Sequence, residues 1–183
     1  TWFGTRAISK QTLQDLQVTE GKEWMPQTSQ QENTIQFNYF MGDQLINIKY
    51  RDGRKNFKLY KGAEKVFYNI NSVVGYDWCV VVEGEMDVLA LHEAGIKNAI
   101  SVPNGATLNS NNLDYLDNCI DYLDDKTKIV LAVDADDAGQ ALRQEFIRRL
   151  GAEVCFLVDF NGQKDANEYL IENGAKELRN AIH

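Results

Sequence analysis

Short apolar segments alternate with amphipathic segments through the second half of the chain, and this alternation constrains the fold more than any other feature. The apolar segments are "WCVVV", "NAISV", "KIVLAV" and "EVCFLVDF". Helices are expected over "EMDVLALHEAG", "NNLDYLDNCIDYL", "DAGQALRQEFIRRLG" and the stretch from about Ala166 onward. Strands that are apolar along their whole length are typical of a parallel sheet covered by helices on both faces. We therefore predict an α/β domain over residues 77–183.

The first 76 residues follow a different pattern. The segments "IQFNYF", "LINIKY" and "NFKLY" alternate apolar with polar or basic residues, as half-exposed strands do. Ser9 can cap a short helix in "ISKQTLQDL". The Asp52-Gly53 pair in "RDGR" predicts a hairpin turn, because this pair readily takes positive φ. We therefore predict a small α+β subdomain over residues 1–76.

Positive charge is concentrated in one part of an acidic chain. Seven Lys and Arg residues lie between Lys49 and Lys65, against Asp52 and Glu64, which gives a local charge of +5. Since the whole chain carries −8, the rest carries −13. A basic strip on an acidic body favours an extended anionic ligand at that place. The alternative is that the strip is only the solvated face of a hairpin.

Two classes of protein are excluded by simple patterns. Cys79, Cys119 and Cys155 are far apart, whereas a zinc site would need close pairs, so we expect buried reduced thiols in an intracellular protein. No stretch approaches the length of apolar sequence that spans a membrane, so we expect no membrane partner.

Acidic residues follow three of the predicted parallel strands. Glu83 follows "CVVV", Asp134 and Asp136 follow "IVLAV", and Asp165 lies in the loop after "CFLVDF", while Asp87 lies in the first turn of the next helix. The carboxyl ends of parallel strands meet at one edge of a sheet, where ligands bind. Any one of Glu85, Asp87 or Asp137 taken alone is better explained as a helix cap or a surface charge. The coincidence of acids after three strands predicts a Mg²⁺ or Mn²⁺ site, because such ions take oxygen ligands.

Three segments carry a resemblance to a known family. "VVVEGEMDVLAL", "VLAVDADDAG" and "KDANEYL" resemble the motifs of the Toprim domain of bacterial primases, topoisomerases and some nucleases, and in detail the primase part of bacteriophage primase-helicases. The resemblance covers about the last hundred residues. "RAISKQTLQDL" and "YRDGRKNFKLY" are similar to the basic subdomain that precedes Toprim there. The resemblance implies a Toprim fold, a parallel Rossmann-like sheet with helices on both faces, after a small basic α+β subdomain.

The resemblance also implies roles for individual residues. The catalytic residues would be Glu83, Asp134 and Asp136. The metal ligands would be Glu83, Asp87, Asp134, Asp136 and Asp165. Nucleotide phosphates would be held by Lys58, with Lys55 and Lys61 as alternatives, and "VPNGA" and "KDANE" would approach the nucleotide through Asn104, Gly105, Lys164 and Asn167.

The function implied is that of a DNA primase catalytic core. Such a core makes short RNA primers on single-stranded DNA from ribonucleoside triphosphates by two-metal nucleotidyl transfer. Neither a zinc-binding spacing nor G-x-x-x-x-G-K-[ST] occurs, so a zinc-binding module and a helicase domain are expected elsewhere in the parent chain or complex. The start "TWFGTRAISK" lacks an initiator Met and suggests a fragment of a longer protein. The expected location is the bacterial cytosol, with a phage or plasmid as a further possible source.

Two alternative functions remain open. A Toprim nuclease would use the same acids to hydrolyse a phosphodiester, and the basic hairpin argues against it. A noncatalytic DNA-binding part of a replicative helicase would not need Glu83, Asp134 and Asp136, which are all present.

Overall fold

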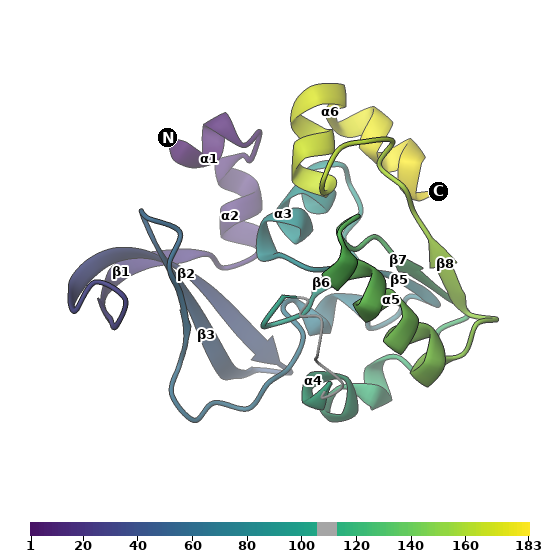
Figure 1. Cartoon of the computed structure of the whole chain (residues 1–183), viewed down its shortest axis with the longest axis horizontal. Helices are drawn as coiled ribbons and strands as arrows, with labels where there is room; N and C mark the ends of the chain where they lie inside the picture. The colour runs from purple at the N-terminus through teal and green to yellow at the C-terminus, as the bar shows by residue number, and fades with distance from the viewer. Residues whose placement is uncertain (106–112) are drawn as a thin grey trace.

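The computed structural model describes residues 1–105 and 113–183, and it contains an antiparallel and a parallel sheet (Figure 1). The parallel sheet has the strand order β6-β5-β7-β8. Its strands are β5 (Trp78–Val82), β6 (Ala99–Ser101), β7 (Lys128–Leu131) and β8 (Cys155–Leu157). The predicted α/β fold with a parallel sheet is confirmed.

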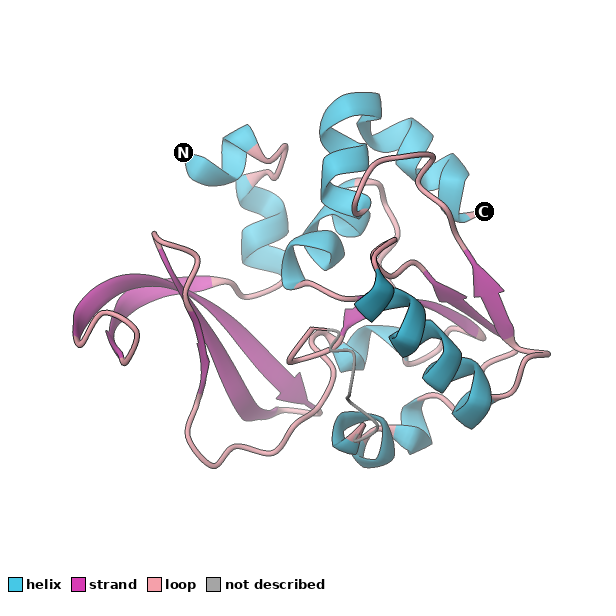
Figure 2. Ribbon diagram, in the orientation of Figure 1, coloured by secondary structure: helices cyan, strands magenta, loops and turns pink. Residues whose placement is uncertain are grey.

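Helices connect these strands and cover the sheet (Figure 2). They are α3 (Glu85–Glu93), α4 (Asp114–Asn118), α5 (Asp137–Leu150) and α6 (Ala166–Ile182). The chain moves from β5 to β6 in one direction and from β6 through β7 to β8 in the other. Because such crossovers are right-handed, α3 lies on one face of the sheet and α4 and α5 on the opposite face. Helix α6 packs against α3.

The antiparallel sheet comes from the first part of the chain. Its strands, in the order β1-β2-β3-β4, are β1 (Thr19–Met25), β2 (Gln30–Met41), β3 (Gln44–Asp52) and β4 (Phe57–Leu59). Two short helices precede it, α1 (Trp2–Thr5) and α2 (Lys10–Asp15), and Ser9 caps α2 by accepting a hydrogen bond from the Thr12 amide, as predicted. The predicted α+β organisation of this region is confirmed, although β1 was not predicted.

The turn between β3 and β4 is present, but the reason given for it from the sequence is wrong. The residue with positive φ is Lys55, at 65°, and neither Asp52 nor Gly53 takes this conformation. The Asp52 carboxylate instead accepts hydrogen bonds from the backbone amides of Arg54 (2.8 Å) and Asn56 (2.9 Å). An aspartate side chain that accepts hydrogen bonds from the backbone amides of its turn stabilises that turn without itself taking a positive φ.

Two further details of the parallel domain correct the sequence prediction. The helix expected over "NNLDYLDNCIDYL" is the five-residue α4 followed by a 3-10 turn at Ile120–Tyr122, and residues 111 and 112 lie outside the described residues. Strand β8 is not buried on both faces, since Phe156 is 47% and Leu157 55% exposed. It is the edge of the sheet, so the side without a neighbouring strand stays open.

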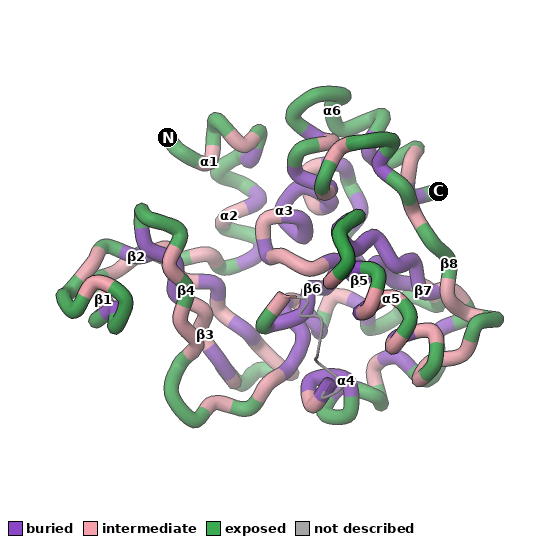
Figure 3. Tube along the Cα trace, in the orientation of Figure 1, coloured by how far each residue is buried: buried purple, intermediate pink, exposed green. Residues whose placement is uncertain are grey.

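The buried apolar residues of both regions form a single core. Figure 3 shows that buried segments occur in both regions. Phe37 and Tyr39 from β2 belong to the same buried cluster as Val80 from β5 and Leu89 from α3. Burial of this apolar area is the main stabilising contribution, at about 25 cal/mol per Å². The antiparallel and parallel sheets therefore share one core, and the predicted division at residue 76 stays a prediction. Among the described helices, none has the length and apolar character to cross a bilayer.

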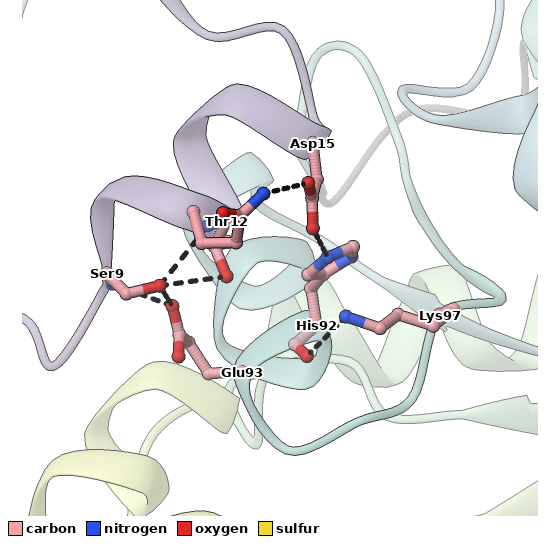
Figure 4. Close-up of polar contacts among 7 residues, drawn as sticks. Ser9, Thr12, Asp15, His92, Glu93 and Lys97 are labelled. Atoms are coloured by element: carbon pink, nitrogen blue, oxygen red, sulfur yellow. Dashed lines mark hydrogen bonds and ion pairs between the residues drawn. The ribbon is translucent and has the colours of Figure 1, made fainter.

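Polar contacts also join α2 to α3 (Figure 4). The amide and hydroxyl of Ser9 both donate to Glu93 Oε1 at 2.6 Å. At the last residue of α2, Asp15 Oδ2 lies 2.9 Å from His92 Nε2, and Lys97 Nζ donates to the His92 carbonyl at 3.3 Å. These contacts hold α2 against α3, and the first turn of α3 carries Asp87.

Candidate active site

The acids predicted from the sequence meet at one edge of the parallel sheet. Glu83 directly follows β5, and Asp134 and Asp136 follow β7. The Asp134 amide donates to Glu83 Oε1 at 3.0 Å, so the loops after these two neighbouring strands are in direct contact. The strands supply the position, since their apolar residues are buried and the first polar residues after them emerge at the same edge.

Two of the acids are also helix N-caps. Asp136 Oδ1 accepts a hydrogen bond from the Gly139 amide at 2.9 Å at the start of α5. Asp165 Oδ1 accepts one from the Glu168 amide at 2.8 Å at the start of α6. Capping satisfies amides that a helix leaves without partners, which explains the backbone conformation here. It uses one oxygen of each carboxylate, so Oδ2 of each is the atom that a metal could bind.

Asp87 is the most strongly perturbed acid of the site. Burial raises the pKa of Asp87 well above its usual range, the negative charges of Asp165, Asp134 and Glu83 raise it further, and a hydrogen bond opposes them. That bond, at 3.0 Å, comes from the Asn167 amide to Asp87 Oδ1. The acids therefore act on one another electrostatically, and their crowding is costly without a cation or proton.

We predict that Asp87→Asn stabilises the fold at pH 7 in metal-free buffer. The folded state holds the Asp87 proton more tightly than the unfolded chain, so ionisation costs stability as pH rises above the unfolded pKa near 4. Asparagine keeps the oxygen that accepts from Asn167. We expect a higher free energy of unfolding than in the wild type at pH 7, and little difference below about pH 4. Thermal unfolding with EDTA from pH 4 to 8 tests this, and a gain independent of pH would contradict it.

Lys164 supplies a positive charge within the acidic edge. Its Nζ lies 3.2 Å from Asp134 Oδ2. Burial raises the pKa of Asp134, and the Lys164 ammonium partly offsets this effect. The lysine was predicted from the sequence to contact nucleotide. In the structure it neutralises one of the predicted metal ligands.

A cavity of about 390 Å³ opens beside these acids. Four of the predicted acids line it, Glu83, Asp87, Asp134 and Asp165, together with Glu85, whereas Asp136 is not among its lining residues. Basic and aromatic residues of the first 76 residues also line it, namely Trp2, Arg6, Lys49, Arg51, Lys55 and Phe57. A larger hollow of about 740 Å³ lies on the antiparallel sheet, but the acids that follow the parallel strands do not line it. The smaller cavity is therefore the candidate active site.

Cation–aromatic contacts order the basic residues of the cavity. The Arg51 guanidinium lies 4.1 Å from the centroid of the Trp2 ring, and the Lys49 ammonium lies 5.2 Å from that of Phe57. Phe57 and Trp2 are both exposed. Such contacts hold positive charge next to an apolar ring face, an arrangement that suits both phosphates and bases.

The structure separates the lysines that were grouped by the sequence. Lys55 lines the cavity. Lys58 forms an ion pair with Glu23 of β1 (2.6 Å) and donates to the Trp24 carbonyl (2.7 Å), and it is not among the residues that line the cavity. Lys61 is exposed and is not among them either.

The remaining nucleotide-binding residues predicted from the sequence are also divided. Gly105 and Lys164 line the cavity, whereas Asn104 is exposed and does not. Asn167 is fully buried, and its side-chain amide donates to the Arg6 carbonyl at 2.9 Å. Asn167 thus links the N-terminal segment to the start of α6, and its amide nitrogen already has a protein partner.

Sequence reasoning did not single out Lys49, Arg51 or Glu85. Lys49 and Arg51 were counted only as part of the basic strip. The strand pattern could have paired Lys49 with Arg51, because residues two apart on a strand point to the same face, and these two both lie on β3. Glu85 was interpreted as a cap or surface charge, but it is buried, and its carboxylate contacts Lys49.

Comparison with known proteins assigns the family. A family model for Toprim-like proteins matches residues 80–170, which include the loops after β5 and β7 and the start of α6. Residues 80–170 therefore belong to the Toprim-like family. A primase homolog protein of Arabidopsis thaliana is 37% identical over 198 residues, which cover 99% of this chain and 57% of that protein. The chloroplastic/mitochondrial Twinkle homolog protein of the same plant is 34% identical and matches 99% of this chain and 27% of its own length.

The fold similarity extends beyond the Toprim domain. The primase fragment of the bacteriophage T7 primase-helicase superposes with a TM-score of 0.82 at 24% identity, over 98% of this chain and 73% of that one. The antiparallel sheet and the Toprim domain thus occur together in both folds. The chain spans 57% and 27% of the lengths of the two plant relatives. The activity, substrates and partners of the whole proteins are therefore only proposals for this chain.

The Toprim acids have the right chemistry for a divalent metal, although they are not gathered around a point. In residues 1–105 and 113–183, no group of three or more His, Cys, Asp or Glu has the spacing of a metal site. Carboxylate oxygens from three loops are nevertheless the donors that Mg²⁺ prefers. The backbone of α5 approaches them closely, since a Cβ on Gly139 would lie 2.7 Å from Glu83 Oε1. The donor set therefore fits a metal, and the side chains would have to turn to meet it.

We predict that Gly139→Ala destabilises the Toprim domain. The added Cβ would lie 2.1 Å from the Asp134 carbonyl oxygen, which is backbone and cannot move aside easily. Overpacking of this kind costs about 1–3 kcal/mol, which outweighs the gain of about 1 kcal/mol from alanine in a helix. Chemical denaturation measures the change. Gly53→Ala is the matched control, because nothing lies within 4 Å of its Cβ position, and equal effects at the two sites would contradict the account.

Proposed function

We propose that the chain is the catalytic core of a DNA primase, which makes short RNA primers on single-stranded DNA. The observation that carries this proposal is the cavity that Toprim acids line together with basic and aromatic side chains. An acidic edge alone would suit several reactions on phosphodiesters. The basic residues add a surface for a nucleotide triphosphate and a template strand, and the similarity to the plant primase homolog supports the same function.

The proposed chemistry is two-metal nucleotidyl transfer. Glu83, Asp87, Asp134, Asp136 and Asp165 would hold Mg²⁺ or Mn²⁺. When bound, divalent ions neutralise the charge that develops on the attacking and leaving oxygens of the phosphate. The hydrogen bond from the Asp134 amide fixes the orientation of the Glu83 carboxylate. Lys164 would leave Asp134 when a metal replaces its charge.

The basic residues of the cavity would bind the substrates. Lys49, Arg51 and Lys55 would contact phosphates of the ribonucleoside triphosphate and of the template. The exposed rings of Phe57 and Trp2 would stack on bases, which every base permits because each has a π face. Lys58 and Lys61 stay predictions for this role, and the ion pair of Lys58 with Glu23 would have to open first.

The wider setting is also proposed. The likeness to the T7 primase fragment supports a helicase domain in the parent chain or complex, and a zinc-binding module is expected with it. The bacterial or phage source and the cytoplasmic location stay predictions, since the two relatives named above are plant proteins.

One assay tests the proposal against its rivals. The chain is incubated with single-stranded DNA of several sequences, Mg²⁺ and labelled ribonucleotides, and the products are separated by length. Short labelled RNA that depends on the template is expected. Shortened DNA without RNA would favour the Toprim nuclease. DNA binding without either product would favour a noncatalytic part of a replicative helicase.

A further inference from the structure

A buried three-residue network joins the antiparallel sheet to the acidic edge. Glu85, the first residue of α3, is only 3% exposed. Lys49 Nζ on β3 donates to both of its carboxylate oxygens, at 3.0 and 3.1 Å. The hydroxyl of Tyr39 on β2 donates to Glu85 Oε1 as well. Glu85 therefore has partners from two strands of the other sheet.

The Tyr39 end of the network is buried, and the Lys49 end reaches the cavity. Tyr39 is fully buried, and its ring lies edge-on to Tyr68 with the centroids 5.2 Å apart. The Lys49 side chain is 11% exposed and lines the same cavity as Glu83, Asp87, Asp134 and Asp165. An ammonium has three N–H donors, so its two contacts with Glu85 do not exhaust it. Glu85 thus holds the Lys49 ammonium in place, and the ammonium keeps a donor for a ligand in the cavity.

Stability alone is a poor explanation for this arrangement. A buried ion pair costs desolvation of both charges, and apolar residues of similar volume often stabilise a fold as well or better. What the pair provides is position. A free lysine samples many side-chain rotamers, and a lysine fixed before the ligand arrives does not lose that freedom on binding.

We propose that Glu85 and Tyr39 are positioning residues, which hold the Lys49 ammonium in place for the phosphates of the incoming ribonucleoside triphosphate. This inference rests on the proposed function. It adds the residues that hold Lys49, one of the lysines proposed to bind the triphosphate. Glu85 acts through Lys49, and Tyr39 acts through Glu85. Neither touches the substrate.

A double-mutant cycle on nucleotide binding tests the inference. Isothermal titration calorimetry measures the Kd of Mg-ATP and Mg-GTP for the wild type, Glu85→Gln, Lys49→Gln and the double variant, without template. Glutamine keeps the size of Glu85 and its bond with Tyr39 but loses the charge that holds Lys49. We expect each single change to weaken binding by about tenfold, the size of one charge-assisted contact, and the double change to be no worse than Lys49→Gln.

Two further variants keep the test decisive. Tyr39→Phe should weaken binding about threefold in the wild type and not at all when Lys49 is already glutamine. If Glu85→Gln does not fold, the Tyr39→Phe measurements with and without Lys49→Gln test the inference in its place. Glu145→Gln is the matched control, because it breaks ion pairs with Arg148 and Arg149 on α5 and should leave the Kd unchanged.

The outcomes separate this inference from the proposed function. Additive effects of the Glu85 and Lys49 changes, a wild-type Kd for Glu85→Gln, or a wild-type chain that binds neither nucleotide would overturn the positioning inference. A chain that shows the expected cycle but makes no primers would contradict only the proposed function. A ¹⁵N signal of the Lys49 ammonium that is visible in the wild type and absent in Glu85→Gln would support the positioning directly.

Discussion

Asp134→Asn is expected to reduce primer synthesis by at least about a hundredfold, because loss of a direct metal ligand should cost more than the 10–100-fold typical of its supporting partners. Glu83→Gln should have a similar effect. The fold should survive, since asparagine retains the size of Asp134 and its burial already disfavours the charged form. The yield of labelled RNA on single-stranded DNA gives the change in rate, and thermal unfolding reports on the fold.

The matched control for this prediction is Asp137→Asn. Asp137 is exposed at the first turn of α5, three residues from Asp134, and does not line the cavity. The same loss of charge there should leave the rate within about twofold, as surface substitutions usually have small effects. Wild-type rates for Asp134→Asn, or equal losses at both positions, would refute the catalytic assignment.

Lys55→Gln is expected to weaken nucleic-acid and nucleotide binding far more than Lys61→Gln. Both lysines belong to the basic strip, but only Lys55 lines the cavity. One charge-assisted hydrogen bond to a phosphate contributes about 1.5 kcal/mol, so we expect about a tenfold rise in the nucleotide KM. The plot of log K for single-stranded DNA against log salt should become shallower by about 0.7 for each phosphate that the variant no longer neutralises.

Glutamine is the informative substitution at Lys55 because the backbone there has a φ of 65°. Glutamine and lysine are both disfavoured in that region, so the change removes charge without adding backbone strain. Fluorescence anisotropy with labelled DNA at several salt concentrations gives the slopes. Equal slopes for the Lys55 and Lys61 variants would show that the cavity does not select between the lysines.

The parallel sheet and its acidic edge could be predicted because their signals are local. "WCVVV" and "KIVLAV" are apolar throughout, and the residues that follow such strands emerge at the ligand-binding edge. The helix caps were predicted at the wrong acids: Glu85, Asp87 and Asp137 were interpreted as caps or surface charges, whereas Asp136 and Asp165 cap α5 and α6. One carboxylate can cap a helix with one oxygen and bind a ligand with the other.

The parts that could not be predicted depend on contacts between distant segments. Strand β1 has the sequence "TEGKEWM", with little apolar alternation, and it is a strand because β2 pairs with it. Without β1 there was no reason to expect that Lys58 would be paired with Glu23. The contact between Lys49 and Glu85 joins residues of two different sheet regions, and no local pattern reports such a pair.

Anomalous diffraction from crystals soaked in Mn²⁺ with a ribonucleoside triphosphate tests the central claim most directly. The triphosphate is included because such sites are usually completed by substrate phosphates. We predict manganese within about 2.5 Å of carboxylate oxygens of Glu83 and Asp134, with Asp136 or Asp165 beside it and Lys164 displaced from Asp134. Manganese density elsewhere on the molecule, with none next to these four acids, would contradict the account.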